Sequence, residues 1–313
     1  MNLVNVLVIS DKYDFTTDFV CIELENKRVN YLRLNRDEFQ NYKIHLDTSN
    51  FDIHVTIEEH EYIISNESLN SIYYRAPIFL REMNQTERSI EEQLYSEQWM
   101  SFVRNLLIFE EVVWINNPEM TYKAENKIVQ LKYAKKIGFN IPYTIVTNTN
   151  PKLKKEKYVV KSLDTAFFNI EGKEGFVYSN VLGKTEIQDA SLELAPVMIQ
   201  DCIYPKTDIR VTVIGNDVFA TSITTKGKGV EMDWRKVKDD VDFNNVSLPL
   251  GIKKKCIQLV KELGLKFGAI DLLKAAENDY IFLEVNPTGE WAWLVHTTGQ
   301  LIPESIVKVL VSK

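Results

Sequence analysis

Cysteine and histidine are scarce in this chain of 313 residues. The three cysteines, Cys21, Cys202 and Cys256, include no Cys-x-x-Cys pair. Such a small, odd set argues against a disulfide framework and against a structural zinc site. Only four histidines are present, so a site built on histidine has few residues to draw on.

Basic charge and long apolar runs are also lacking. The 37 Lys and Arg residues are outnumbered by 44 Asp and Glu residues, which gives a net charge of -7. Nucleic-acid-binding domains usually carry a basic excess, so we expect no nucleic-acid partner. No apolar run approaches the ~20 residues of a membrane span, and the first residues lack the pattern of a signal peptide. We therefore expect a soluble cytoplasmic protein without a membrane partner.

Hydrophobic residues, by contrast, make up 45% of the chain, enough to build a full core. Near the N-terminus, apolar runs at 5–10 and 29–35 flank a helical pattern at 14–28. This order of strand, helix and strand predicts a small α/β lobe. We also predict a β-hairpin within 51–65 and a further strand at 71–79.

Two longer helices are predicted next. The first begins at a capping box formed by Ser89 and Glu92. Its apolar stripe, expected in the core, consists of Tyr95, Trp99, Phe102, Val103 and Leu106. The second begins with Asn117 as N-cap and Pro118 as first helical residue, and it ends at Gly138. Its buried stripe is predicted to contain Ala124, Ile128, Leu131 and Ala134.

From Ile141 on, short strand-like runs separated by glycine and proline predict a region rich in sheet. A helix is expected at about 251–263, followed by strands at 266–273 and 280–286 and by a short C-terminal helix. No internal repeat or low-complexity tract is visible in the sequence.

The last two strands carry polar side chains on otherwise apolar faces. If the turn between them is centred on Glu277 and Asn278, Asp271 lies directly opposite Glu284, with Cβ atoms ~4.5–5.5 Å apart. Two carboxylates this close repel each other unless a cation or a proton lies between them. With the amide oxygen of Asn286 they form a hard oxygen set that suits Mg²⁺ completed by phosphate oxygens. The alternative is a solvated hairpin face.

A metal held by so few protein oxygens implies a phosphate partner, which needs cations nearby. Lys161 ends an apolar strand, where it is either an edge residue or a phosphate ligand. Lys127, on the second helix, is by itself an ordinary surface lysine. The strand edge at Gln200–Ile203 offers backbone groups suited to an adenine. Asp208 and Arg210 share one strand face, either as an exposed pair or as the wall of a cleft.

The order and spacing of these blocks resemble a known family. Six blocks of this sequence resemble the ATP-grasp superfamily. They are "NNPEMTYKAENK", "VVKSL", "MIQDCI", "TDIRVTVIG", "AIDLL" and "LEVNPTGEWAWL". The last block, with "VLVISDKYDFTTDFV" and "SIYYRAP", resembles the ATP-grasp peptide maturases that crosslink ribosomal peptides, the graspetide synthetases of microviridin type. The resemblance spans nearly the whole chain, and its most specific parts are "DIR" and "NPTGEWAW".

This resemblance implies an α/β protein with the ATP-grasp fold. Residues 1–115 would form an N-terminal pre-ATP-grasp lobe that binds peptide, and residues 116–313 the ATP-grasp domain. Within that domain, a central lobe would span about 116–198, and a C-terminal lobe with an antiparallel sheet about 199–313. The implied cofactors are ATP and Mg²⁺, and the implied partners are a precursor peptide with leader and core and a second copy of the chain.

The family's nucleotide and metal residues map onto this sequence one by one. Lys127 and Lys161 match the two lysines that bind the nucleotide phosphates, and Arg235 matches a basic position that faces them. The adenine hinge corresponds to Gln200, Asp201, Cys202 and Ile203. The magnesium ligands correspond to Asp271, Glu284 and Asn286.

The substrate residues follow in the same way. Arg210 is expected to hold the acceptor carboxylate, and Asp208 either addresses the nucleophile or, as in related glutamate ligases, lies near the ribose. Arg75 matches a basic strand position expected to contact the peptide, although Ala76 stands where the family often has a second arginine. Glu290 and the two tryptophans beside it either wall the peptide site or pack the lobe.

The implied reaction transfers the γ-phosphoryl group of ATP to an Asp or Glu side chain of the peptide. A Ser or Thr hydroxyl or a Lys amine then attacks the acyl phosphate and closes a ring. The segment 169–176 is either a lid over the phosphates or a plain hairpin turn. Two alternatives remain open, namely an ATP-grasp ligase that adds glutamate or another amino acid and a non-enzymatic nucleotide-binding protein.

Overall fold

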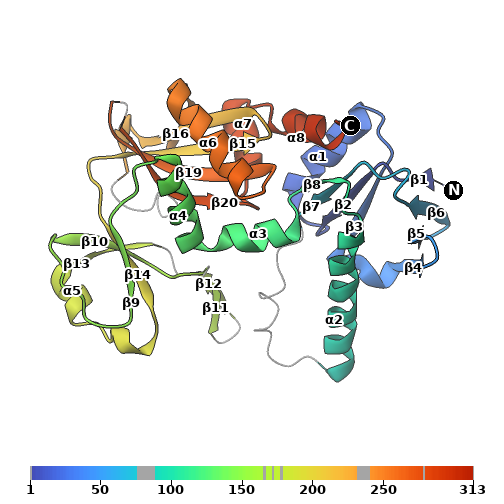
Figure 1. The fold of residues 1–313 in the computed structure, drawn as a ribbon, viewed down its shortest axis with the longest axis horizontal. Coiled ribbons are helices and arrows are strands. Elements are labelled where there is room, and N and C mark those ends of the chain that lie inside the picture. Colours follow the sequence, from blue (N-terminus) through green and yellow to red (C-terminus); the bar gives the residue numbers. More distant parts are fainter. Residues whose placement is uncertain are drawn as a thin grey trace.

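The computed structural model describes residues 2–75, 89–164, 167–170, 173–176, 179–230, 240–277 and 279–312, with the backbone alone at 167–170 and 173–176. Figure 1 shows three groups of elements, with the N-terminal lobe at the right. The central sheet lies at the lower left and the C-terminal sheet above it. Both chain ends lie on the side of the N-terminal lobe.

The N-terminal lobe is built on a parallel sheet in the order β3-β2-β7-β8. Its strands are β2 (Val6–Ser10), β3 (Tyr31–Asn35), β7 (Ser71–Tyr74) and β8 (Val113–Ile115). Helix α1 (Phe15–Asn26) connects β2 to β3, which confirms the predicted order of strand, helix and strand. A smaller sheet contains β1 (Asn2–Leu3), β4 (Tyr42–Asp47), β5 (Asp52–Ile57) and β6 (His60–Ile64), with the predicted hairpin as β5 and β6.

The first long helix, α2 (Ile90–Asn105), begins at the predicted capping box of Ser89 and Glu92. Its stripe is only partly buried. Val103 and Leu106 are in the core, whereas Tyr95 is 43% exposed at the start of the helix. The strand predicted at 71–79 already ends at Tyr74, and residues 76–88 lie outside the described residues.

The second long helix is in fact two helices, α3 (Pro118–Glu125) and α4 (Lys127–Ile137). Asn126 is extended, and its side-chain amide donates to the Tyr122 carbonyl at 2.7 Å, which ends α3. The break turns Ile128 outward, so this residue is 49% exposed and the prediction that it belongs to the buried stripe was wrong. Ala124, Leu131 and Ala134 are buried as predicted.

The central sheet has the strand order β13-β10-β14-β9. Its strands are β9 (Thr144–Thr147), β10 (Lys157–Lys161), β13 (Asn180–Gly183) and β14 (Val197–Asp201), and α5 (Lys184–Gln188) follows β13. A separate antiparallel pair, β11 (Phe167–Ile170) and β12 (Lys173–Phe176), lies between this sheet and α2 in Figure 1.

The C-terminal sheet is antiparallel, in the order β17-β16-β15-β19-β20, with β18 on β16. Its strands are β15 (Thr207–Ile214), β16 (Asp217–Thr225), β17 (Lys228–Gly229), β18 (Asp242–Asn245), β19 (Phe267–Ala276) and β20 (Asp279–Asn286). Helices α6 (Leu250–Glu262), α7 (Ala292–Thr298) and α8 (Ile302–Leu310) complete the chain. The mixed α/β architecture with an antiparallel C-terminal sheet is the predicted fold class.

The cores of the two ends of the chain are joined. Val8, Val20 and Leu24 of the N-terminal lobe form one buried cluster with Trp291 and Ile306 near the C-terminus. The predicted domain boundary at 115/116 falls between β8 and α3. Because the core crosses this boundary, the N-terminal lobe packs directly against the segment that follows β20.

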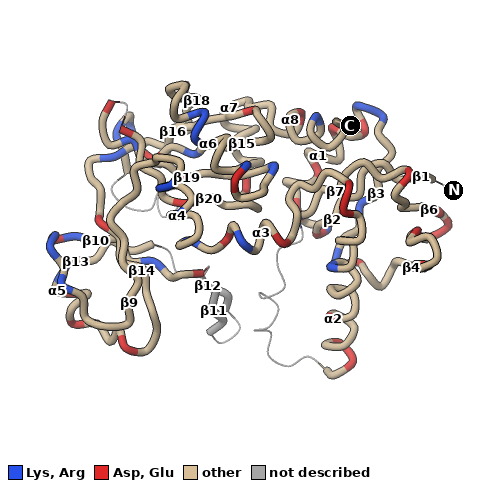
Figure 2. The backbone as a smooth tube through the Cα atoms, in the orientation of Figure 1, with Lys and Arg blue, Asp and Glu red and all other residues tan. Residues whose placement is uncertain are grey.

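Charges are distributed over all three groups of elements. In Figure 2, segments of Lys and Arg alternate with segments of Asp and Glu along the described chain. Among the described helices, none has the length and apolar character needed to cross a membrane.

Candidate nucleotide and metal site

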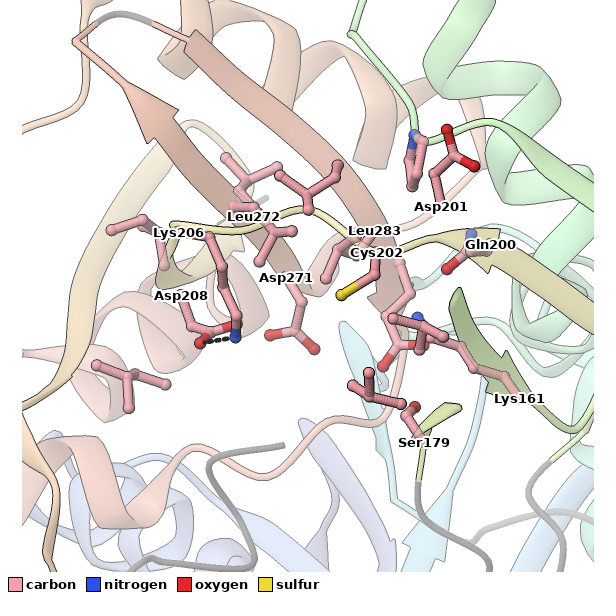
Figure 3. A pocket seen from close by; sticks show the side chains of 18 residues that line it. Lys161, Ser179, Gln200, Asp201, Cys202, Lys206, Asp208, Asp271, Leu272 and Leu283 are labelled. Atoms are coloured by element: carbon pink, nitrogen blue, oxygen red, sulfur yellow. Dashed lines mark hydrogen bonds and ion pairs between the residues drawn. The ribbon is translucent and has the colours of Figure 1, made fainter. Parts of the chain in front are cut away.

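A pocket lies between the central sheet and the C-terminal sheet (Figure 3). It encloses about 860 Å³, counting the part open to solvent. The residues predicted from the sequence that line it are Lys161, Gln200, Asp201, Cys202, Ile203, Asp208, Asp271 and Glu284. Residues from five strands thus meet in one space, although they are up to 123 positions apart (161 to 284).

The predicted metal residues lie on β19 and β20. Asp271 is paired directly with Glu284, so the predicted register is confirmed. Two irregularities between this pair and the end of the hairpin offset each other, which is why a regular count along the two strands gives the expected pairing. Asn286 lies one row further, opposite Ala269, and its amide nitrogen is 3.5 Å from Asp271 Oδ2.

Arg210 extends this row of polar residues onto β15, where it is paired with Asp271. Its Nη1 donates to Asp271 Oδ1 at 2.9 Å and Oδ2 at 3.1 Å, and its Nη2 donates to the Glu290 carbonyl at 3.2 Å. Arg210 Nε is buried and has no hydrogen-bond partner among the described residues. The positive guanidinium therefore lies against Asp271, one of the two opposed carboxylates, where a like-charged pair needs a cation nearby.

The donor set fits Mg²⁺ with phosphate ligands rather than a metal held by protein alone. Among the described residues, no three His, Cys, Asp or Glu side chains converge on one point. Asp271 and Glu284 offer two carboxylates, and Asn286 can add an amide oxygen. A magnesium ion at this place needs further oxygens from phosphate and water, which is how Mg²⁺ is usually bound.

The two predicted phosphate lysines are placed differently. Lys161 lies at the end of β10, an inner strand of its sheet, and lines the pocket. Lys127 is the first residue of α4, and its Nζ donates to the Ser162 carbonyl at 2.8 Å. Lys127 therefore reaches the residue that follows Lys161, although it is not among the residues that line the pocket.

The predicted hinge begins inside β14 and continues beyond it. Gln200 is 2% exposed, and its amide donates to Thr144 Oγ1 at 3.0 Å. Asp201 is paired with Lys155 at 2.7 Å. Cys202 and Ile203 follow the end of β14 and line the pocket, with the Cys202 sulfur directed into it in Figure 3.

Lys206 was missed in the sequence. Its side chain is only 9% exposed, lines the pocket and forms an ion pair with Asp208 (Figure 3). Lys206 lies two residues before Asp208, which lies two residues before Arg210. The alternation along the strand that puts Asp208 and Arg210 on one face therefore puts Lys206 on the same face. The ion pair places a cation beside Asp208 in the pocket.

Arg75 and Glu290 lie outside this pocket and contact each other. Arg75 Nη2 donates to Glu290 Oε1 at 2.6 Å, Nη1 to the Thr288 carbonyl at 2.8 Å and Nε to Asp14 Oδ2 at 3.2 Å. Thr16 Oγ1 donates to the other Glu290 oxygen at 2.5 Å. That these residues bind peptide stays a prediction.

The charges around Arg75 support one another. Burial works against the charge of Arg75, but Tyr73, Glu290 and Asp14 outweigh it and raise the pKa of Arg75. Burial likewise tends to raise the pKa of Asp14, but the charge of Arg75 and the Thr17 hydroxyl outweigh it, so the pKa of Asp14 is lowered. Both groups therefore carry full charge at neutral pH.

Two buried amides also escaped the sequence analysis. Asn116 donates to the carbonyls of Phe267 and Pro287 at 2.9 and 2.7 Å. Gln130 donates to the Val285 carbonyl at 2.8 Å and accepts from the Val285 N–H at 3.1 Å. Asn116 and Gln130 are 2% and 3% exposed, and their only sequence signal was an amide inside an apolar pattern.

Three further predictions fall on other parts of the chain. Trp291 is fully buried and packs on Phe19 with ring centroids 6.2 Å apart, so it packs the lobe. Arg235 lies within 231–239, outside the described residues. The segment 169–176 is part of the hairpin of β11 and β12, and its role as a lid stays a prediction.

No family model and no curated protein sequence matches the chain. Solved structures match it over nearly its whole length. The macrocyclase MdnC of Microcystis aeruginosa MRC, bound with the precursor peptide MdnA, is 21% identical with a TM-score of 0.83, covering 99% of this chain and 100% of that chain. A RiPP-associated ATP-grasp ligase of Chryseobacterium gregarium, in complex with ADP and a leader and core peptide, is 26% identical with a TM-score of 0.81, covering 99% and 96%.

A third solved structure matches with a lower TM-score. D-alanyl-alanine synthetase A of Vibrio cholerae is 11% identical with a TM-score of 0.57, covering 99% of this chain and 98% of that chain. The predicted resemblance is thus confirmed in the fold. The chain has the ATP-grasp fold, and in structure it is more similar to the two peptide-associated ATP-grasp proteins than to the D-alanyl-alanine synthetase.

Proposed function

We propose that this protein is an ATP-dependent ligase that closes side-chain rings in a ribosomally made precursor peptide. A carboxylate oxygen of a peptide Asp or Glu attacks the γ-phosphorus of ATP, and ADP leaves. A Ser or Thr hydroxyl or a Lys amine of the same peptide then attacks the acyl carbon, and phosphate leaves. The net change is the loss of one water per crosslink, as an ester or an amide.

The observation that carries this proposal is the composition of the pocket between the central and C-terminal sheets. It combines the hinge at Gln200–Ile203, the cations Lys161 and Lys206 and the opposed carboxylates of Asp271 and Glu284. A nucleotide whose base lies at the hinge would direct its phosphates toward the lysines and the carboxylates. Catalysis of this type depends on positioning and on charge stabilisation more than on covalent steps by the protein.

Each group has a proposed role. Lys161, Lys127 and Arg235 offset charge on the transferred phosphoryl group. Arg210, which donates to Asp271 and to the Glu290 carbonyl, is the proposed contact of the acceptor carboxylate. Asp208 either accepts the proton of the nucleophile or contacts the ribose, and its position beside Lys206 in the nucleotide pocket supports the ribose.

Mg²⁺ would be held by Asp271, Glu284 and Asn286, and it would neutralise charge on the phosphate oxygens of the nucleotide. Similar structures support both cofactors. The ATP-grasp ligase PsnB was solved in complex with a minimal precursor, Mg and ADP. PsnB is 17% identical to this chain, with a TM-score of 0.76.

The peptide substrate is the part of the proposal that rests on similarity. The structures of MdnC, PsnB and the Chryseobacterium gregarium ligase contain precursor, leader or core peptides. We extend this substrate class to the present chain, with a leader segment and a core that is modified. A homodimer and a cytoplasmic location belong to the same proposal, and sedimentation equilibrium of the purified chain tests the dimer.

The test needs a candidate precursor, which is sought as a short reading frame near the gene for this chain that encodes a peptide rich in Ser, Thr or Lys and in Asp or Glu. Incubation with the protein, ATP and Mg²⁺ is expected to remove one water per crosslink, as followed by mass spectrometry. Glu284→Gln is expected to abolish the loss, because it removes one metal carboxylate. Glu277→Gln, an exposed residue in the turn of the same hairpin, is the matched control and should keep full activity.

Other outcomes point to the alternatives. ADP release driven by glutamate or another free amino acid, without change in the peptide, would identify a ligase of another substrate class. ATP binding without turnover by any carboxylate would identify a nucleotide-binding protein. Retained activity in Glu284→Gln would contradict the metal assignment.

A further inference from the structure

The segment that follows Glu284 is held in place by side chains from several other elements. Gln130 of α4 binds both backbone groups of Val285, and Asn116, at the end of β8, binds the Pro287 carbonyl. From β15, Arg210 binds the Glu290 carbonyl. The predicted metal residue Asn286 lies inside this segment, and Glu284 directly precedes it.

One attachment comes from the N-terminal lobe and includes an ion pair. Arg75, the residue that follows β7, donates to the Thr288 carbonyl at 2.8 Å and to the Glu290 carboxylate at 2.6 Å. Its third nitrogen, Nε, donates to Asp14 at 3.2 Å, and Asp14 in turn caps α1. Every nitrogen of the Arg75 side chain therefore donates to a protein group, and the residue is only 9% exposed.

Packing on the opposite side leaves this segment little room to move. A Cβ placed on Gly289 would lie 2.6 Å from Ala269 Cβ and 2.9 Å from Arg210 Nη2. Gly289 therefore sits directly on β19 and on the guanidinium that binds Asp271. A shift of the Thr288–Glu290 backbone must displace Arg210, which would disturb the carboxylate of Asp271.

We propose that Arg75 is a positioning residue for the metal site rather than a contact of the peptide. It fixes Thr288 and Glu290, and through them the oxygen of Asn286 and the pairing of Arg210 with Asp271. This inference rests on the proposed function, because it assumes that these residues bind Mg²⁺ with a nucleotide. The loss of residues that support metal ligands commonly weakens metal binding by about 10- to 100-fold.

The test measures binding instead of turnover. ADP binding to the purified full chain is followed by calorimetry at fixed ADP while the Mg²⁺ concentration is varied, and the Mg²⁺ midpoint is compared between variants. Arg75→Gln is expected to raise the midpoint about 10-fold or more while leaving ADP binding without metal unchanged. Arg75→Lys, which keeps the charge but has one donor nitrogen in place of three, should give an intermediate midpoint.

Arg33→Gln is the matched control, because Arg33 is another partly buried arginine of the same lobe that pairs with an aspartate, Asp18 at 2.5 Å. Thermal unfolding of both variants separates a general loss of stability from the proposed effect. Arg33→Gln should lower the melting temperature without moving the Mg²⁺ midpoint. If Arg75→Gln does not fold, Glu290→Gln, which weakens the same contact at the other end, provides the comparison.

The outcomes distinguish this inference from the proposed function. A folded Arg75→Gln protein with an unchanged Mg²⁺ midpoint and a raised KM for the peptide would overturn the inference and support peptide contact. A Mg²⁺ midpoint raised equally by Arg33→Gln would also overturn it. If the wild-type chain binds ADP with no dependence on Mg²⁺, the metal assignment and the inference fail together.

Discussion

The two sides of the proposed active site are built differently. On the nucleotide side, Lys161, Cys202 and Asp208 line open space. On the metal side, the segment 285–290 has the carbonyls of Val285, Pro287, Thr288 and Glu290 bound to side chains of other elements. We infer that the nucleotide side receives the ligand, whereas the metal side holds its own polar groups in place before the ligand binds. Groups fixed in advance need no reorganisation during the reaction, which is the basis of electrostatic catalysis.

The largest expected effect is on the metal side. Asp271→Asn removes a predicted metal carboxylate. It also removes the charged partner of Arg210, so the Arg210 guanidinium loses its ion pair in the same variant. We expect crosslinking to slow by at least about 10²-fold, a loss typical of removing one charge-stabilising group. Mass spectrometry of the peptide over time measures the rate, and a rate within a few-fold of wild type would contradict the assignment of Asp271.

The nucleotide side should respond to Lys206. Lys206→Gln removes the cation beside Asp208, and we expect ADP affinity to fall by about 10- to 100-fold, as for the loss of one charged hydrogen bond. Calorimetry with ADP and Mg²⁺ checks this. Lys155→Gln, which removes the partner of Asp201 at an exposed position, is the control and should have a much smaller effect.

The tight packing of the metal side can be tested without any ligand. Gly289→Ala forces a methyl group against Ala269 and Arg210, and we expect a loss of about 1–3 kcal/mol in the free energy of unfolding. Gly251→Ala, in α6 where a Cβ meets nothing within 4 Å, should be neutral or stabilising. Denaturant unfolding measures both, and equal effects would contradict the claim that the segment 287–290 is held tightly.

The smallest expected effect is on the pH dependence of stability. Burial tends to raise the pKa of Asp14, but Arg75 and the Thr17 hydroxyl outweigh it, so in the folded state the pKa lies below the ordinary value of 3.8. A carboxylate with a lowered folded pKa stabilises the protein above its unfolded pKa, and this contribution is lost as the pH falls through the folded pKa. Asp14→Asn should therefore lower the melting temperature at pH 7. Below about pH 4, the melting temperatures of the variant and the wild type should lie closer together. A difference that does not change with pH would argue against a charged contact between Asp14 and Arg75.

Local sequence patterns predicted the pairing of Asp271 with Glu284 correctly. A short turn fixes which residues of a hairpin lie opposite each other, so Asp271 and Glu284 could be paired from the sequence. The capping boxes and terminal glycines likewise depend on neighbours within a few residues. Ile128 was misplaced because the Asn126 side chain donates to the Tyr122 carbonyl and the helix breaks there, which an apolar stripe does not reveal.

The attachments of the metal side could not be predicted in this way. Arg75 binds Glu290 from 215 positions away, and Asn116 binds Pro287 from 171 positions away. A polar residue in an apolar strand indicates that some partner exists, but only the packing of the lobes decides which one. The sequence therefore showed these residues as polar without showing what they hold.

The most direct test of the proposed chemistry traces the oxygen atoms of the peptide carboxylates into the released phosphate. The Asp and Glu carboxylates of the peptide are labelled with ¹⁸O, and the peptide is incubated with the protein, ATP and Mg²⁺. If the carboxylate attacks the γ-phosphorus, each crosslink must transfer one labelled oxygen to the released phosphate. Mass spectrometry of the phosphate is expected to show one ¹⁸O per crosslink, and crosslinked peptide with unlabelled phosphate would contradict the proposed acyl phosphate.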